Sequence, residues 1–243
     1  MNRKIKIVCA FGTRPEAIKM SPLVLALRSH PAFDTKVLVT AQHRELLDSV
    51  LDTFGIVPDH DLNIMRGGQT LTEIVTRALP GVGDYLAAEK PEILLVHGDT
   101  ATTFAASLAG FYAGVAVGHV EAGLRTHNKL EPYPEEMNRL LTGRIADAHF
   151  APTRAARQNL LKENISAEYI YVTGNTEIDA IRSLLSKEGT YRFKRGALNT
   201  FDKSGRLIVM TAHRRENLGK PMVEICRAMR RVEIGRASCR ERV

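Results

Sequence analysis

The sequence has few cysteines, few aromatic residues and no long hydrophobic run. Its three cysteines, Cys9, Cys226 and Cys239, are an odd number without a CxxC pair, which argues against a disulfide framework and against a zinc site. Tryptophan is absent and no basic segment is interleaved with aromatic residues, so nucleic-acid recognition is not indicated. No apolar run approaches the length of a membrane-spanning helix. We therefore expect reduced thiols, no metal, and neither nucleic acid nor membrane among the partners.

The net charge and the N-terminal residues indicate the type of ligand and the cellular location of the protein. The chain carries a formal net charge of +7 with its basic residues scattered, which fits an anionic small molecule better than a polynucleotide. The apolar run at residues 7–11 is shorter than a signal-peptide core, and Gly12-Thr13-Arg14 follows it instead of a small-residue cleavage site. We interpret this run as a buried strand and expect a cytoplasmic protein.

Short apolar segments rich in β-branched residues alternate with helical patterns along most of the chain. Near-continuous apolar strands between amphipathic helices are typical of a parallel sheet covered on both faces, with right-handed crossovers. We predict an α/β protein with a doubly wound fold. The predicted strands are residues 5–10, 35–40, 93–96, 116–120, 149–151 and 169–172, and the predicted helices are 15–29, 43–54, 101–113, 135–145, 155–163 and 175–187.

A second series begins after this one. A fresh strand at 207–211 and a helix at 221–231 are too little for a domain core, and the residues after them show neither helical nor strand periodicity. The predicted parts are an N-terminal Rossmann-like domain at 1–174, a connecting helix and linker at 175–206, the incomplete start of a second Rossmann-like domain at 207–231, and an artefactual or disordered tail at 232–243.

Charged clusters follow four of the predicted strands, at residues 12–16, 97–100, 121–125 and 211–216. The carboxyl ends of parallel strands open on the same side of a sheet, so side chains placed there converge on one crevice. This convergence predicts an enzyme. A GxGxxG fingerprint is absent, which argues against a nicotinamide or flavin, and we expect no cofactor.

The first cluster suits an anion. Gly12 permits a tight turn, and Pro15 suits a first helical turn whose free N–H groups attract negative charge. Arg14 adds a planar fork for phosphate and Lys19 a point charge one turn further on. A purely structural turn with solvated charges is the alternative.

Carboxylates end two strands and open one helix. Asp99 follows an apolar strand, where it faces the crevice unless it or Thr100 only caps the next helix. Glu121 ends the following strand, which favours a functional role. Glu135 and its neighbour Glu136 open a helix, where the dipole stabilises them whatever their role.

Two basic clusters are less specific. His213 and Arg214 follow the strand of the second series and suit a pyrophosphate. Gln42 and His43 close the second strand, and their side chains cap a helix, bind ligand or do neither.

Five ordered segments resemble the bacterial non-hydrolysing UDP-N-acetylglucosamine 2-epimerases, over about residues 5–231. The resemblance implies two Rossmann-like domains in the GT-B arrangement, a homodimer, and interconversion of UDP-N-acetylglucosamine and UDP-N-acetylmannosamine for cell-surface polysaccharide without metal or nicotinamide. The matching segments are FGTRPEAIKM at 11–20, HGDT at 97–100, GHVEAGLR at 118–125, PEEMNR at 134–139 and TAHRREN at 211–217.

The resemblance also implies roles for single residues. The implied route eliminates UDP across C1 and C2 of the sugar and adds it back on the other face, which requires acid–base groups and cations for the leaving pyrophosphate. The implied acid–base carboxylates are Asp99, Glu121 and Glu135, His213 is implied to contact or protonate the leaving phosphate, and the implied substrate-binding residues are Arg14, Lys19, Asp99, Glu121, His213 and Arg214.

The chain departs from the family at two places. Family members continue for on the order of a hundred further residues, enough for an ordinary domain, with a uridine-diphosphate-binding stretch. We therefore expect this chain to be weakly active or inactive. Some relatives bind a second, activating substrate molecule at a regulatory site that Gln42 and His43 match. Glu45 and Gly68 stand where those relatives carry Gln and Arg.

Two other functions fit the same crevice. A GT-B glycosyltransferase needs one general base and an acceptor site, so three carboxylates favour epimerisation. A nucleotide-sugar-binding fragment without catalysis is the second alternative, and tight UDP binding without turnover would indicate it.

Overall fold

The computed structural model describes residues 3–42, 44–186, 208, 210–212 and 218–232. The chain divides into two compact units, Met1–Glu188 and Gly189–Val243, which we describe separately. Across the described residues, no helix is both long and apolar enough to cross a membrane.

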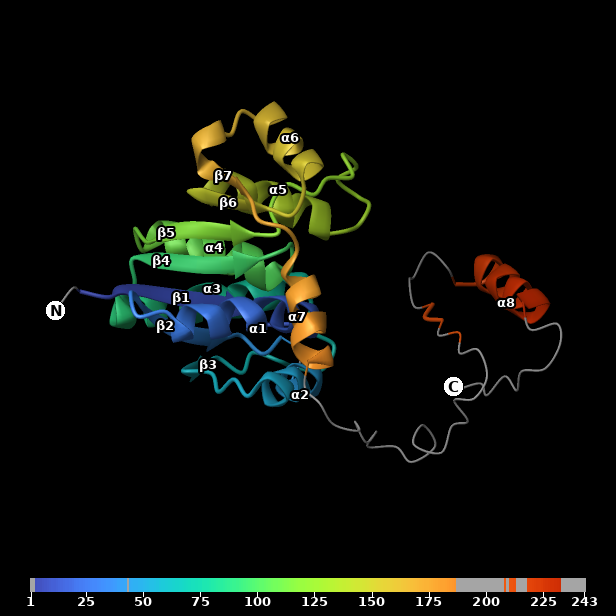
Figure 1. Ribbon diagram of the computed structural model, residues 1–243, viewed down its shortest axis with the longest axis horizontal. Helices are drawn as coiled ribbons and strands as arrows, with labels where there is room; N and C mark the ends of the chain where they lie inside the picture. Colours follow the sequence, from blue (N-terminus) through green and yellow to red (C-terminus); the bar gives the residue numbers. More distant parts are fainter. Residues whose placement is uncertain (1–2, 43, 187–207, 209, 213–217, 233–243) are drawn as a thin grey trace. The chain divides into compact units, whose positions relative to one another are not determined.

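The first unit is built on one parallel sheet in the order β3-β2-β1-β4-β5-β6-β7 (Figure 1). The order reverses between β1 and β4, and in such sheets ligands bind beyond the carboxyl ends of the strands at this switch point. The strands are β1 (Ile5–Phe11), β2 (Phe33–Val39), β3 (His60–Asp61), β4 (Ile93–His97), β5 (Ala116–Val120), β6 (Ala148–Ala151) and β7 (Ile170–Val172).

Helices cover both faces of this sheet. Successive side chains of β1 point to opposite faces of the sheet. Cys9 and Phe11 pack into one core with α1 and α2. Val8 and Ala10 pack into a second core with α3 and α4. Helix α7 lies along α1, and its Ala180 belongs to the first of these cores (Figure 1). The helices are α1 (Arg14–Ser29), α2 (Arg44–Phe54), α3 (Leu71–Glu89), α4 (Ala101–Tyr112), α5 (Glu135–Ile145), α6 (Arg154–Lys162) and α7 (Thr176–Leu185).

Polar caps start several helices at the carboxyl edge of the sheet. Thr100, Thr153 and Asn175 each accept a backbone N–H of the following first turn through the side-chain oxygen. These caps fix where each helix begins relative to the strand before it. The side chains next to the caps are thereby held at the edge where the crevice was predicted.

The predicted doubly wound α/β architecture is confirmed, with two additions. The sequence patterns did not predict the two-residue strand β3 or the long helix α3. In the second unit the helix predicted at 221–231 is present as α8 (Lys220–Val232). The predicted strand at 207–211 lies partly outside the described residues, and Ile208, Met210 and Thr211 carry no strand assignment. Residues 233–243 of the predicted tail are outside the described part.

Candidate active site

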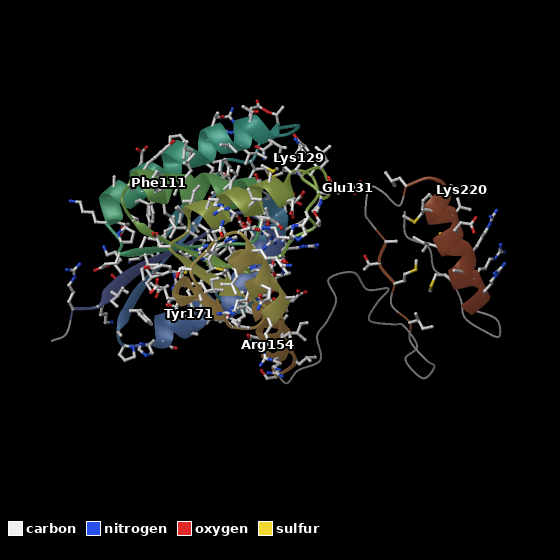
Figure 2. The ribbon with its side chains drawn as sticks, turned by 90° about the horizontal axis from the view of Figure 1, so that it is seen from above. Phe111, Lys129, Glu131, Arg154, Tyr171 and Lys220 are labelled. Atoms are coloured by element: carbon white, nitrogen blue, oxygen red, sulfur yellow. The ribbon has the colours of Figure 1, made fainter. Side chains whose placement is uncertain are left out.

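A pocket of about 300 Å³ opens at the carboxyl ends of β1, β4 and β5, at the switch point of the sheet. It brings together Lys19, Asp99, Glu121 and Glu135, which come from separate segments of the sequence. The loop from β5 to α5 extends from the same edge, and Figure 2 shows Lys129 and Glu131 projecting from it, at the end of the unit opposite Phe111. The predicted convergence is therefore present for residues that follow β1, β4 and β5, whereas most of the fourth cluster, at 211–216, is outside the described residues.

A wider depression of about 670 Å³ lies near the amino ends of β1 and β4. Two ion pairs lie in it, Lys6 with Glu89 at 3.1 Å and Arg3 with Glu92 at 2.5 Å. This depression is at the opposite end of the strands from the predicted crevice.

The turn after β1 is fixed by a buried carboxylate that sequence reasoning did not single out. Glu16 Oε2 accepts the backbone N–H groups of Gly12 and Thr13 at 3.1 and 2.8 Å. Its Oε1 accepts the hydroxyls of Thr100 and Thr103 at 2.8 and 3.0 Å. Burial raises the pKa of Glu16, and these hydrogen bonds oppose the rise. Glu16 therefore joins the turn after β1 to the start of α4.

Glu121 lies among several polar side chains of the pocket and is only 8% exposed. Lys19 Nζ donates to its Oε2 at 2.5 Å, and Arg139 Nη2 donates to its Oε1 at 3.3 Å. Asn175 Nδ2 donates to Oε2 at 3.4 Å, and His97 Nε2 lies 3.8 Å from the same oxygen. The backbone of Glu121 has φ +62°, a left-handed conformation that a non-glycine residue rarely adopts.

The protonation state of Glu121 depends on the charged side chains around it. Burial by itself raises the pKa of Glu121, but His97 when protonated, Lys19 and Arg139 outweigh burial and bring the pKa below its usual value. Burial lowers the pKa of His97 to about 4, so His97 is neutral at neutral pH. The cations that hold Glu121 as a carboxylate at pH 7 are therefore Lys19 and Arg139.

The other two predicted carboxylates have different surroundings. Thr100, not Asp99, caps α4, and Asp99 Oδ2 accepts from Arg139 Nη2 at 2.5 Å. Glu135 begins α5, and its Oε2 is buried without a hydrogen-bond partner among the described residues. A buried unpaired oxygen is costly, which is consistent with a partner supplied by a ligand. Glu136 instead clamps the preceding loop, accepting two backbone N–H groups at 3.0 Å.

Of the remaining predicted residues, the structure describes Arg14 and Gln42. Arg14 is the exposed first residue of α1, one position from Pro15, which lines the pocket. Gln42 also lines the pocket and accepts the Thr102 hydroxyl at 3.0 Å. His43, His213 and Arg214 are outside the described residues.

Arg125 belongs to the strand-end cluster at 121–125 but turns away from the pocket. It forms a two-bond ion pair with Glu163 at 2.6 and 2.9 Å, and only 1% of its side chain is exposed. No group of three or more histidine, cysteine or acidic side chains among the described residues is arranged to hold a metal ion.

One titrating group in this site, His97, predicts that the stability of the protein falls in acid. The folded-state pKa of His97, about 4, lies below the ordinary value of 6.5, so protonation favours unfolding. Above pH 6.5 the titration of His97 leaves the free energy of unfolding unchanged. As the pH falls from 6.5 toward 4, the free energy of unfolding decreases by about 3 kcal/mol at most.

Urea unfolding at pH 7 and at pH 4 measures this difference. We expect His97→Gln to lose less stability between these two values than the parent does, whereas the exposed His30→Gln should follow the parent. An unchanged pH dependence in His97→Gln would contradict the assignment.

Comparison with known proteins decides the family. A family model described as UDP-N-acetylglucosamine 2-epimerase matches residues 25–238. The chain belongs to the UDP-N-acetylglucosamine 2-epimerase family. It is 56% identical over 230 residues to the UDP-N-acetylglucosamine 2-epimerase of Bacillus subtilis, covering 95% of this chain and 59% of the relative.

Solved structures of the same family superpose on the chain. A putative UDP-N-acetylglucosamine 2-epimerase from Listeria monocytogenes matches with a TM-score of 0.87 and 54% identity, covering 97% of this chain and 61% of that one. The enzyme from Neisseria meningitidis, solved bound to UDP-GlcNAc, matches with a TM-score of 0.72 and 54% identity over 75% of this chain and 50% of its own. The Rossmann-like, GT-B-type fold class is thereby confirmed. The chain spans about 60% of the length of the curated relatives it matches.

Proposed function

We propose that this protein interconverts UDP-N-acetylglucosamine and UDP-N-acetylmannosamine at sugar C2. The observation that carries the proposal is the pocket at the switch point, where Asp99, Glu121 and Glu135 lie together with Lys19. Family membership supports the substrate, because a solved relative is bound to UDP-GlcNAc and another to UDP-GlcNAc and UDP.

The residue types suit the proposed reaction. The C2 hydrogen is not adjacent to a carbonyl and is a weak acid, so direct deprotonation is unfavourable. In the proposed route a carboxylate takes the C2 proton, the C1–O bond breaks and UDP leaves, which gives a glycal. UDP then re-adds at C1 while a carboxylic acid returns a proton to C2 on the opposite face. In the elimination the electron pair of the C2–H bond becomes the second bond of the C1–C2 double bond, and the C1–O pair leaves with UDP. On re-addition the double-bond pair takes the returned proton to form the new C2–H bond, and an oxygen lone pair of UDP forms the C1–O bond.

Five residues receive roles in this proposal. Asp99, Glu121 and Glu135 act as the acid–base carboxylates, because a pair on opposite faces of the ring is the minimum for inversion at C2. Lys19 and Arg14 bind the substrate, with their charges offsetting those of the diphosphate.

Two further assignments include residues outside the described part of the chain. His213 and Arg214 are proposed to contact the leaving pyrophosphate. Gln42 and His43 are proposed as part of a regulatory substrate site, although Glu45 and Gly68 differ from the residues of relatives that have one. Binding of a second substrate molecule, measured by calorimetry, tests that assignment.

We further propose a cytoplasmic homodimer that uses no cofactor and supplies N-acetylmannosamine-type sugars for cell-surface polysaccharide. The family resemblance supports the dimer, and analytical ultracentrifugation tests it directly. A sedimenting monomer at micromolar concentration would contradict the dimer without affecting the proposed chemistry.

The proposed reaction is tested by incubating UDP-N-acetylglucosamine with the 243-residue chain and, beside it, with the complete product of its gene. We expect the complete gene product to give the anomeric proton signals of both nucleotide sugars at equilibrium without any acceptor or added metal, and the 243-residue chain to give them slowly or not at all. Sugar transfer only when an acceptor is supplied would indicate a glycosyltransferase, and UDP binding by both folded proteins without turnover by the complete gene product would indicate a binding protein.

A further inference from the structure

Arg139 lies at the centre of the pocket's polar network. It comes from α5, and 5% of the residue is exposed. Its Nη2 donates to Asp99 Oδ2 at 2.5 Å and to Glu121 Oε1 at 3.3 Å, while its Nη1 donates to the backbone oxygen of Glu121. One guanidinium therefore contacts both strand-end carboxylates and the backbone of one of them.

The contact with two carboxylates has an electrostatic consequence. Two carboxylates that share a site repel each other, and without a cation between them one of them takes up a proton. A buried guanidinium has fixed donor directions and stays charged at every physiological pH, so it both neutralises and orients such a pair. Its bond to the Glu121 backbone also holds that residue in its left-handed conformation.

We propose that Arg139 is a positioning residue that holds the Asp99 and Glu121 carboxylates side by side. The proposal rests on the proposed epimerase function for its kinetic test, but its structural part does not depend on turnover. Arg139 does not line the pocket itself, so it acts through the two carboxylates and not on the substrate.

The other groups that face Glu121 do not replace Arg139. Lys19 from α1 contacts Oε2, the opposite oxygen, and also lies 4.0 Å from Glu177 of α7. His97 from β4 is neutral at neutral pH, and the Asn175 amide carries no charge. Arg139 is also the only basic side chain within ion-pair distance of Asp99 among the described residues. Removing Arg139 therefore leaves Asp99 without a cationic partner among the residues that the structure describes.

Arg125 supplies a matched control. Like Arg139 it is a buried arginine that makes two charge-assisted bonds, but its partner is Glu163, outside the pocket. Arg125→Met should reduce stability without changing how the reaction depends on pH. Comparing the two arginines thus separates loss of a buried ion pair from loss of carboxylate positioning.

The kinetic experiment compares Arg139→Met, Arg139→Lys and Arg125→Met in the full-length gene product. We expect Arg139→Met to lower kcat by about 10²-fold, the size of effect that a misplaced acid–base group produces. The apparent pKa of the acidic limb of its kcat–pH profile should rise by about one unit, because the remaining charges no longer hold Glu121 ionised. Arg139→Lys should keep part of both properties, because it retains the charge and loses the fork.

A second measurement uses the unsubstituted protein and does not depend on turnover. In the parent chain labelled with ¹³C at the glutamate carboxyls, the Glu121 signal should titrate below the ordinary value of a glutamate. Titration of Glu121 above that value would overturn the proposal, as would an active Arg139→Met enzyme with the parent's pH profile. A parent without turnover whose Glu121 still titrates low would contradict only the epimerase assignment.

Discussion

Replacement of Glu121 with glutamine is expected to slow turnover by about 10²–10⁴-fold, the range for loss of a general acid–base group. Glutamine keeps the shape of the side chain and can still contact Lys19 and Arg139, so the loss reports on proton transfer more than on packing. Because the amide cannot accept a proton at neutral pH, raising the pH should not restore the rate. Initial rates of UDP-N-acetylmannosamine formation measure the effect.

Glu163→Gln provides the control for this substitution. Glu163 is also a partly buried, ion-paired carboxylate, but it pairs with Arg125 outside the pocket. We expect Glu163→Gln to lower the melting temperature and to keep the parent's kcat. A Glu121→Gln enzyme within threefold of the parent rate would remove Glu121 from the acid–base chemistry.

Adding a methyl group at Gly12 is expected to destabilise the first unit by about 2–4 kcal/mol, from overpacking together with a lost hydrogen bond. A Cβ at this position would lie 1.9 Å from Thr40 Oγ1 and 2.7 Å from Thr102 Oγ1. Those two hydroxyls bond each other at 2.9 Å, and Thr102 also bonds Gln42 at the pocket. The Gly12→Ala methyl therefore displaces groups that shape the site.

Gly83→Ala is the matched control for this prediction. Gly83 lies within α3, and a Cβ there meets nothing within 4 Å. Alanine in a helix interior is favoured over glycine by roughly 1 kcal/mol, so this variant should gain stability. Urea unfolding of both variants measures the difference, and equal stability of Gly12→Ala and the parent would contradict the close approach at Gly12.

The location of the site followed from the sequence because a parallel sheet leaves little freedom. Once the segments of β1, β4 and β5 were predicted to be strands of one parallel sheet, the residues directly after them had to lie at one edge. Asp99 and Glu121 reach the pocket for this reason, and Lys19 reaches it from α1. Whether Asp99 or Thr100 capped α4 was open at the level of sequence, and the structure resolves it through the bond from Thr103 N–H to the Thr100 hydroxyl.

Side chains that act across the fold were not predictable in the same way. Glu16 looks like an ordinary capping-box residue in the sequence, and only the fold, which places the starts of α1 and α4 at the same edge of the sheet, brings it to Thr100. Arg139 is one of several charged residues in α5, and nothing in its spacing indicates that it faces Asp99. For Arg125 the sequence misled in the opposite direction. Its place in a strand-end cluster suggested that its side chain faces the crevice, but it pairs with Glu163 instead.

Two elements were missed for local reasons. Helix α3 contains Pro80, Gly81 and Gly83, which are breaker residues and interrupt the pattern, but its buried positions Ala78, Val82 and Leu86 still pack on the sheet. Tertiary packing overrides a weak local preference in such a case. Strand β3 has only two exposed residues and no hydrophobic signal, so its pairing with β2 is visible only in the structure.

Deuterium incorporation tests the central claim most directly. The complete gene product and the 243-residue chain are each incubated with UDP-N-acetylglucosamine in D₂O, and C2 of the sugar is followed by NMR. The proposed elimination and re-addition predicts that the N-acetylmannosamine product carries deuterium at C2 and that Glu121→Gln abolishes the exchange. Product formed with the original C2 hydrogen retained would contradict proton transfer through the pocket's carboxylates.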